Sequence, residues 1–215
     1  MDTTSLIRIP QIAVLGTDEF DRCMKENDLN KIAFSKNKID KDIISKFLKG
    51  EISSKLKNTL SKFLDKMRSP LAIRSSSLLE DSQYQPLSGM YATYMLPNSN
   101  RSKTKRLKEL TKAIKLVYAS TYLKEPSSLI EKSVHRHEEE KMAVIIMELI
   151  GKKHQDRFYP SASGLAQSYN YYPVSYMKRN EGVAYLALGL GRTIAEGDKS
   201  LRFSPKYPDI IPQYF

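Results

Sequence analysis

The strongest constraint on the fold is a nearly continuous apolar run late in the chain. Residues 142–150 read Met-Ala-Val-Ile-Ile-Met-Glu-Leu-Ile, with Glu148 as the one charged residue. The length suits a strand, and an unbroken apolar pattern is typical of a strand buried on both faces. Further strands are expected at residues 71–74, 91–95, 163–168 and 183–188. The second half of the chain is therefore predicted to be rich in strands.

Apolar residues at helical spacing predict helices in the first half. The segments are 17–27, 40–50 and 53–70, with Thr17 and Asp40 as expected N-caps. Apolar residues recur at helical spacing, with lysines between them, over the basic segment 103–124, which predicts a fourth helix. Helices followed by strands favour an α+β fold with a helical first half and a mixed sheet.

Charge and cysteine content limit the partners and the compartment. The formal net charge of +11 favours anionic partners such as nucleic acids, anionic lipids or nucleotide triphosphates. No apolar stretch is long enough to cross a membrane, and the N-terminus does not resemble a signal peptide. With Cys23 alone, no internal disulfide is possible. We therefore expect a cytoplasmic protein without a membrane partner.

A short motif in the middle of the chain points to anion binding. Arg74 ends an apolar strand and is followed by the hydroxyl residues Ser75–Ser77, and Gly89 lies in the loop beyond. A guanidinium, hydroxyl donors and a glycine that admits close approach of the backbone suit a phosphate. An alternative is that Arg74 pairs with a nearby carboxylate, such as Glu80 or Asp81.

Several segments follow one another in an order that supports this interpretation. Residues 70–81 read Pro-Leu-Ala-Ile-Arg-Ser-Ser-Ser-Leu-Leu-Glu-Asp, and Leu-Ser-Gly-Met-Tyr-Ala-Thr-Tyr follows them. The later segments are 142–150, Ser-Gly-Leu-Ala-Gln-Ser at 163–168 and Ala-Leu-Gly-Leu-Gly-Arg-Thr-Ile-Ala-Glu-Gly at 187–197. Together they resemble the nucleotide-binding domain of phosphoenolpyruvate synthases and pyruvate phosphate dikinases.

This resemblance implies an ATP-grasp-like fold that binds ATP with Mg²⁺, in two parts at residues 1–100 and 101–215. In the family, ATP phosphorylates a carrier histidine on another domain, which passes the phosphate to pyruvate or another acceptor. Arg74 matches the family's phosphate-binding arginine, with Ser75 beside it. The loop from Ser88 through Gly89 and Met90 to Thr93 matches its phosphate flap, and Glu148 matches the adenine-binding position.

Departures from the family pattern predict an incomplete site. No Gly-Gly-Lys-Gly segment precedes Arg74, Arg192 replaces an acidic residue, and no histidine lies in a carrier motif. Neither the family's metal-binding carboxylates nor any other metal ligands are identified in the chain. We therefore expect a fragment of a larger phosphotransferase that is inactive in isolation, with the Mg²⁺ ligands and the carrier and acceptor domains outside it.

Other candidate residues favour structural interpretations. His135, His137 and His154 do not form a convincing metal pattern, and Cys23 has no evident histidine base. A tyrosine cluster could pack or stack on a base: Tyr169, Tyr171, Tyr172 and Tyr176. The rival to the phosphotransferase interpretation is a non-catalytic module whose basic helix binds an acidic partner, with nucleic acid less favoured. A dikinase-type enzyme with an acceptor other than pyruvate also stays open.

Overall fold

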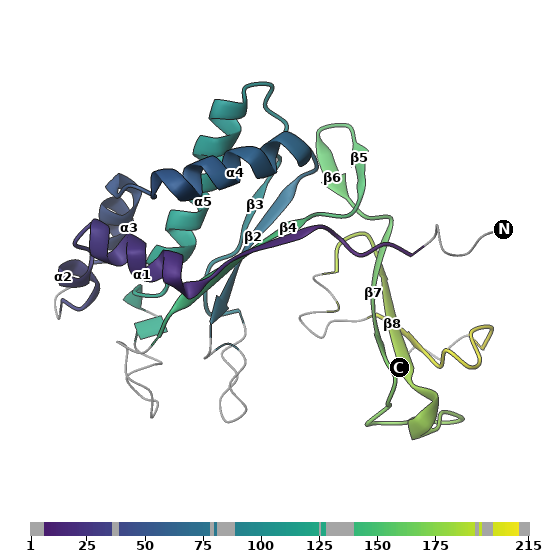
Figure 1. Cartoon of the computed structure of the whole chain (residues 1–215). Coiled ribbons are helices and arrows are strands. Elements are labelled where there is room, and N and C mark those ends of the chain that lie inside the picture. The colour runs from purple at the N-terminus through teal and green to yellow at the C-terminus, as the bar shows by residue number, and fades with distance from the viewer. Residues whose placement is uncertain are drawn as a thin grey trace. The chain divides into compact units, whose positions relative to one another are not determined.

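The chain forms two compact units, residues 1–149 and 150–215 (Figure 1). The computed structural model describes residues 7–35, 39–77, 80, 89–124, 126–127, 140–191, 194 and 200–210. The sequence predicts a division after residue 100. The contacts instead divide the chain at residue 149, because strands from both sides of residue 100 pair in one sheet.

The first unit is built on a four-stranded sheet in the order β1-β4-β2-β3. Every strand pair is antiparallel in the described part of the chain, although a mixed sheet was expected. In the central pair, Arg74 lies opposite Ile145, and Leu71 lies opposite Glu148. The strands are β1 (Ile12–Leu15), β2 (Leu71–Ser77), β3 (Tyr94–Leu96) and β4 (Met142–Glu148).

Five helices among the described residues of this unit supply the rest of its core. α5 contacts β2, β3 and β4, and α1 contacts β4. Phe20, Phe47, Leu64 and Ile114 are among the buried apolar side chains that join these helices and the sheet in one hydrophobic cluster. The helices are α1 (Thr17–Glu26), α2 (Asn30–Ala33), α3 (Asp40–Lys49), α4 (Ser54–Lys66) and α5 (Lys103–Ser120).

The prediction that the apolar strand is buried on both faces is wrong. Val144 and Ile146 of β4 are fully buried, whereas Ile145 and Met147, which alternate with them, are only partly buried. Val14 pairs with Ile145 on the same face and is 63% exposed. Side chains alternate across a strand, and in the described residues the helices bury one face of this sheet. The other face, which carries Arg74, is left accessible.

The predicted helix starts agree with the structure to within one residue. Ser53 caps α4, where its side chain accepts a hydrogen bond from the Leu56 N–H at 3.2 Å. Thr17 and Asp40 are the first residues of α1 and α3, and Gly16 and Ile39 hold the cap positions. None of the described helices is long and apolar enough to span a lipid bilayer.

The second unit contains a hairpin and a three-stranded antiparallel sheet. The expected strands at 163–168 and 183–188 are present and pair with each other, which confirms their prediction. The α+β class expected from the sequence is also confirmed. The strands are β5 (Lys152–His154), β6 (Arg157–Tyr159), β7 (Ala162–Gln167), β8 (Val183–Leu188) and β9 (Leu201–Phe203).

Candidate functional site

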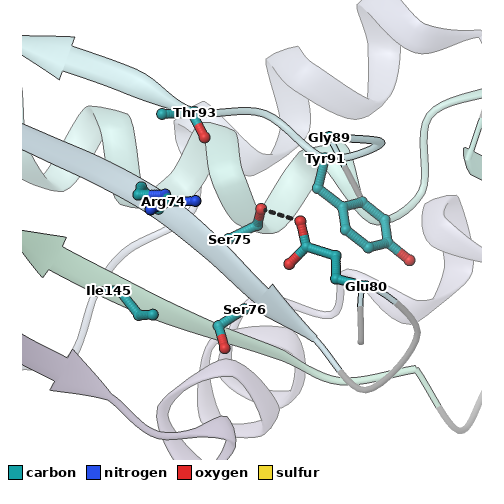
Figure 2. Close-up of a pocket in the computed structure, with 8 residues that line it drawn as sticks. All are labelled: Arg74, Ser75, Ser76, Glu80, Gly89, Tyr91, Thr93 and Ile145. Atoms are coloured by element: carbon teal, nitrogen blue, oxygen red, sulfur yellow. Dashed lines mark hydrogen bonds between the residues drawn. The ribbon is translucent and has the colours of Figure 1, made fainter. Parts of the chain in front are cut away.

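The predicted anion motif lines a pocket where β2 and β3 stop pairing. The pairing covers Leu71 to Ile73, so from Arg74 onward no described strand pairs with β2 on that side. Side chains from both faces of β2 can therefore reach the opening, which has a volume of about 280 Å³. That is the lower end of the range for ligand sites and suits phosphate groups rather than a whole nucleotide. We call this the phosphate pocket; Figure 2 shows its lining residues: Arg74, Ser75, Ser76, Glu80, Gly89, Tyr91, Thr93 and Ile145.

Arg74 is available for a ligand. It lies on the accessible face of the sheet, and within the described residues its guanidinium has no hydrogen bond or ion pair. It does not pair with Glu80, which accepts hydrogen bonds from Ser75 and Ser77 instead, and Asp81, the other carboxylate considered, lies outside the described residues. A guanidinium carries five N–H donors, which makes an unpaired one a strong site for phosphate or carboxylate.

The three serines belong to the strand rather than to a loop. β2 continues through Ser77 because Ser75, Ser76 and Ser77 pair with Val144, Ala143 and Met142 of β4. The alternation of the strand places Ser76 on the same face as Arg74, and Ser75 on the other. The Ser75 hydroxyl donates to the Glu80 carboxylate at 2.8 Å.

Glu80 is a pocket residue that sequence reasoning missed as a site residue. Its carboxylate accepts from the Ser77 N–H at 3.2 Å, and its own N–H donates to Ser77 Oγ at 3.4 Å. These reciprocal bonds are those of a capping box, for which a serine followed three residues later by a glutamate is the sequence signal. That Ser-x-x-Glu spacing was present and could have placed Glu80 beside the serines.

The segment opposite β2 begins at a glycine with unusual backbone geometry. Gly89 has φ +80°, a conformation that side chains disfavour, and a Cβ there would meet no atom within 4 Å. Thr93 also lines the pocket, whereas Met90 is partly buried against the hydrophobic core. Ser88 lies outside the described residues. Gly89 and Thr93 therefore line the same pocket as Arg74, whereas Met90 packs against the core.

Buried hydrogen bonds fix the rest of this segment. The Tyr91 hydroxyl donates to the Glu140 carboxylate at 2.9 Å, and both residues are buried. The Ala92 N–H donates to Ser120 Oγ at the end of α5. Burial and the Glu140 charge raise the pKa of Tyr91 well above its usual range, so the phenol stays a protonated donor. The wall beyond Gly89 is thus held in place.

Glu148 lies outside the phosphate pocket and already has several partners. It is three residues along β4 from Ile145, about 10 Å away at the usual rise of a strand. Its carboxylate accepts from Ser69 Oγ at 2.9 Å, Arg8 Nη2 at 3.0 Å and the Gln11 N–H at 3.3 Å. Burial raises its pKa, but these donors outweigh burial and hold the pKa below its usual value. The structure does not bring Glu148 to Arg74.

Most of the remaining candidates have no site around them. Burial raises the pKa of Cys23 to about 11, which leaves an inert thiol. His154 stacks on Tyr159, and His135 and His137 lie outside the described residues. In the second unit, Tyr169 and Tyr171 pack edge to face with ring centres 4.9 Å apart, and Tyr172 is exposed. The described residues contain no group of three or more His, Cys, Asp or Glu side chains that could hold a metal ion.

Several cations of the basic helix α5 have partners within the protein. The Arg106 guanidinium is buried and donates to the Leu64 and Met67 carbonyls. Lys115 Nζ donates to the Leu48 and Gly50 carbonyls, where it caps the C-terminus of α3. Part of the positive charge in this segment therefore stabilises the fold.

The first unit is thus an α+β unit in which one pocket is lined by hydroxyl groups, a glycine with positive φ and an arginine that has no partner among the described residues. Residues 1–209 match the family of the pyruvate phosphate dikinase AMP/ATP-binding domain, and the chain belongs to that family. It is also similar to a Bacillus subtilis (strain 168) protein described as "Uncharacterized phosphotransferase YvkC". The two are 26% identical over 190 residues, which cover 88% of this chain and 20% of the relative. The chain thus spans about a fifth of the length of the curated relative it matches.

Proposed function

We propose that the phosphate pocket binds the phosphates of ATP and that Arg74 is the residue that neutralises their charge. The observation that carries this proposal is the accessible Arg74 guanidinium, which lacks a partner among the described residues. An arginine whose N–H donors point into a pocket and are not used by the described residues can bind an anion through several charge-assisted hydrogen bonds. Membership of an AMP/ATP-binding domain family supports ATP as that ligand.

The proposed roles of the other residues follow from their positions. Thr93 supplies a hydroxyl donor, and Gly89 admits a phosphate oxygen close to the backbone. Ser75 supplies a second hydroxyl donor once its proton turns from the Glu80 carboxylate to a phosphate oxygen. Ser88 and Met90, which flank Gly89 in the sequence, stay proposed members of the same flap. We keep Glu148 as the proposed acceptor for the adenine amino group, because a carboxylate with three donors can accept a further one.

In the whole protein we propose a phosphotransferase of the dikinase type. Bound ATP would donate a phosphoryl group to a carrier histidine on another domain, which passes it to pyruvate or another acceptor. Such transfers depend on alignment and charge neutralisation, which Arg74 would provide by holding the phosphates as the P–O bond breaks. Mg²⁺ bound to the phosphates would supply further charge neutralisation. We propose that the isolated chain binds ATP but does not complete transfer.

The rival proposal, a non-catalytic module that binds an acidic partner through α5, has less support. Arg106 and Lys115 of this helix donate to main-chain carbonyls, and Lys103 forms an ion pair with Asp65. These contacts leave fewer cations for a partner, whereas Arg74 is accessible in a pocket.

Titration calorimetry with ATP and Mg²⁺ tests the proposed ATP site. Arg74→Ala removes charge-assisted hydrogen bonds, so we expect affinity to fall about 10- to 100-fold. Arg101→Ala removes one exposed cation outside the pocket and should bind ATP as the wild type does. Equal affinity in wild type and Arg74→Ala would refute the role of Arg74. A wild-type chain that binds no ATP would refute the site.

A further inference from the structure

Glu80 is a charged residue of the phosphate pocket to which the proposed function gives no role. Its carboxylate lies against Ser75 in Figure 2 and accepts hydrogen bonds from Ser75 Oγ and the Ser77 N–H. Hydroxyl and main-chain N–H groups are the donors that bind phosphate oxygens in proteins. A carboxylate of the protein therefore already holds donors that an incoming phosphate would use.

The charges around the pocket also bear on which form of a nucleotide can enter. Among the described lining residues, Arg74 and Glu80 carry the formal charges, and the two cancel. A free triphosphate carries roughly three to four negative charges at neutral pH, because each phosphate contributes at least one. Glu80 repels such an anion, and its repulsion opposes the attraction of Arg74.

A divalent cation on the phosphates reverses the sign of this interaction. Mg²⁺ at nucleotide sites is usually held by one or two carboxylates together with the substrate phosphates. No cluster of three potential ligands occurs in the described residues, so they offer no metal cage of their own. A single carboxylate beside the phosphates fits a cation that arrives on the nucleotide.

We propose, on the basis of the ATP site above, that Glu80 makes the pocket selective for the divalent-cation complex of the nucleotide over the free nucleotide. The carboxylate repels the free polyphosphate and attracts the complex, either as a metal ligand or through a metal-bound water. Glu80 is thus a specificity residue rather than a passive part of the wall.

The variant must separate this role from the structural role of Glu80. Glutamine also serves as the partner in a capping box, so Glu80→Gln keeps an acceptor for the Ser77 N–H while it removes the charge. Glu109→Gln makes the same charge change at an exposed position of α5 outside the pocket and is the matched control. Glu80→Asp retains the charge on a shorter side chain.

The experiment compares ATP affinity in Mg²⁺ with ATP affinity in EDTA by titration calorimetry. The wild type should bind the Mg²⁺ complex more tightly than free ATP. Glu80→Gln should lower the ratio of the dissociation constant in EDTA to that in Mg²⁺ by about tenfold. Free ATP should bind Glu80→Gln more tightly than it binds the wild type. Glu109→Gln and Glu80→Asp should keep the wild-type ratio.

Two failures are distinguishable. If a folded Glu80→Gln protein binds ATP with the wild-type ratio, the selectivity proposal is overturned and the ATP site stands. If the wild type binds ATP neither with nor without Mg²⁺, both proposals are overturned. Circular dichroism establishes that each variant is folded, and Glu80→Ala replaces Glu80→Gln in the same comparison if the latter unfolds.

Discussion

Two regions of the β2–β4 strand pair differ in how their charged groups are used. In the middle of the pair, where it lies opposite Ile145, Arg74 faces the phosphate pocket without a partner among the described residues. At the end where Leu71 lies opposite Glu148 is a group of hydrogen-bonded polar residues that we call the anchor cluster. It consists of Arg8, Ser69, Asn98, Arg106 and Glu148.

Contacts in the anchor cluster join four parts of the first unit. Arg106 Nη1 donates to the Asn98 side chain at 3.3 Å, and the Asn98 amide donates to the Ser69 carbonyl at 2.9 Å. Ser69 Oγ then donates to Glu148, which also holds Arg8. Through Glu148 of β4, these bonds tie α5, the turn before it, the entry to β2 and the N-terminal segment together. Arginine therefore stabilises the fold at one end of the strand pair, whereas Arg74 in the middle of the pair has no partner among the described residues.

The largest effect that would sharpen this comparison is expected at Arg106. Arg106→Ala removes the donor from the Leu64 and Met67 carbonyls and from Asn98, and leaves a cavity. Its Nε and Nη2 have no hydrogen-bond partner among the described residues, so losing the buried charge offsets part of the cost. We expect a loss of about 2–4 kcal/mol in the free energy of unfolding, measured by urea denaturation.

Arg74→Ala and Arg106→Met are the controls for this prediction. Arg74 is exposed, so its removal should change stability by less than about 0.5 kcal/mol. Arg106→Met fills most of the volume without a donor and should recover part of the loss. Wild-type stability in Arg106→Ala would mean that the anchor cluster does not hold the fold.

A smaller effect, with a defined pH dependence, is expected at Glu148. Its folded-state pKa lies below the ordinary value of 4.5, so its stabilisation is complete above that pH. Stability is lost as the pH falls through the folded-state pKa. Glu148→Gln should cost about 1–2 kcal/mol at pH 7 and should flatten the loss of stability below pH 4.5, measured by urea denaturation across pH. Glu109→Gln is exposed and should keep the wild-type pH profile.

The same variant tests the adenine role proposed for Glu148. Inorganic tripolyphosphate carries the charge of ATP without the base. If Glu148 binds adenine, Glu148→Gln should weaken ATP more than it weakens tripolyphosphate. An equal change for the two ligands would leave Glu148 as a purely structural member of the anchor cluster.

Local signals in the sequence predicted the helices well, because caps and helical spacing are properties of neighbouring residues. Thr17 and Asp40, the expected N-caps, are instead the first residues of α1 and α3, so these helix starts were predicted to within one residue. The apolar run at β4 was assigned two buried faces because its composition does not show how many layers cover it. Ile145 and Met147 are apolar yet only partly buried, and only the tertiary fold determines this.

The sequence predicted those residues of the candidate site that lie within one motif. It did not predict the contacts that distant segments make around the site. Arg74, Ser75, Gly89 and Thr93 follow from the motif and lie around one pocket. Glu140 holds the pocket wall by accepting a hydrogen bond from Tyr91, and Glu148 accepts one from Arg8. In both pairs the partners are far apart in the chain. A single sequence does not reveal which carboxylates those partners already occupy.

The smallest expected effect concerns Gly89, and the chain offers a matched control for it. Gly89 and Gly189 have φ angles of +80° and +75°, and a Cβ at either position would meet no atom within 4 Å. Alanine at each should therefore cost about 1 kcal/mol, from backbone strain alone, measured by thermal unfolding. Gly89 lines the phosphate pocket, whereas Gly189 belongs to the second unit. Because the extra methyl group stands where a phosphate oxygen is proposed to approach, Gly89→Ala should weaken ATP binding several-fold and Gly189→Ala should not. Equal ATP affinities in the two variants would show that Gly89 shapes the turn without contacting a ligand. The part of the pocket that binds the ligand would then consist of Arg74 and its neighbours on β2.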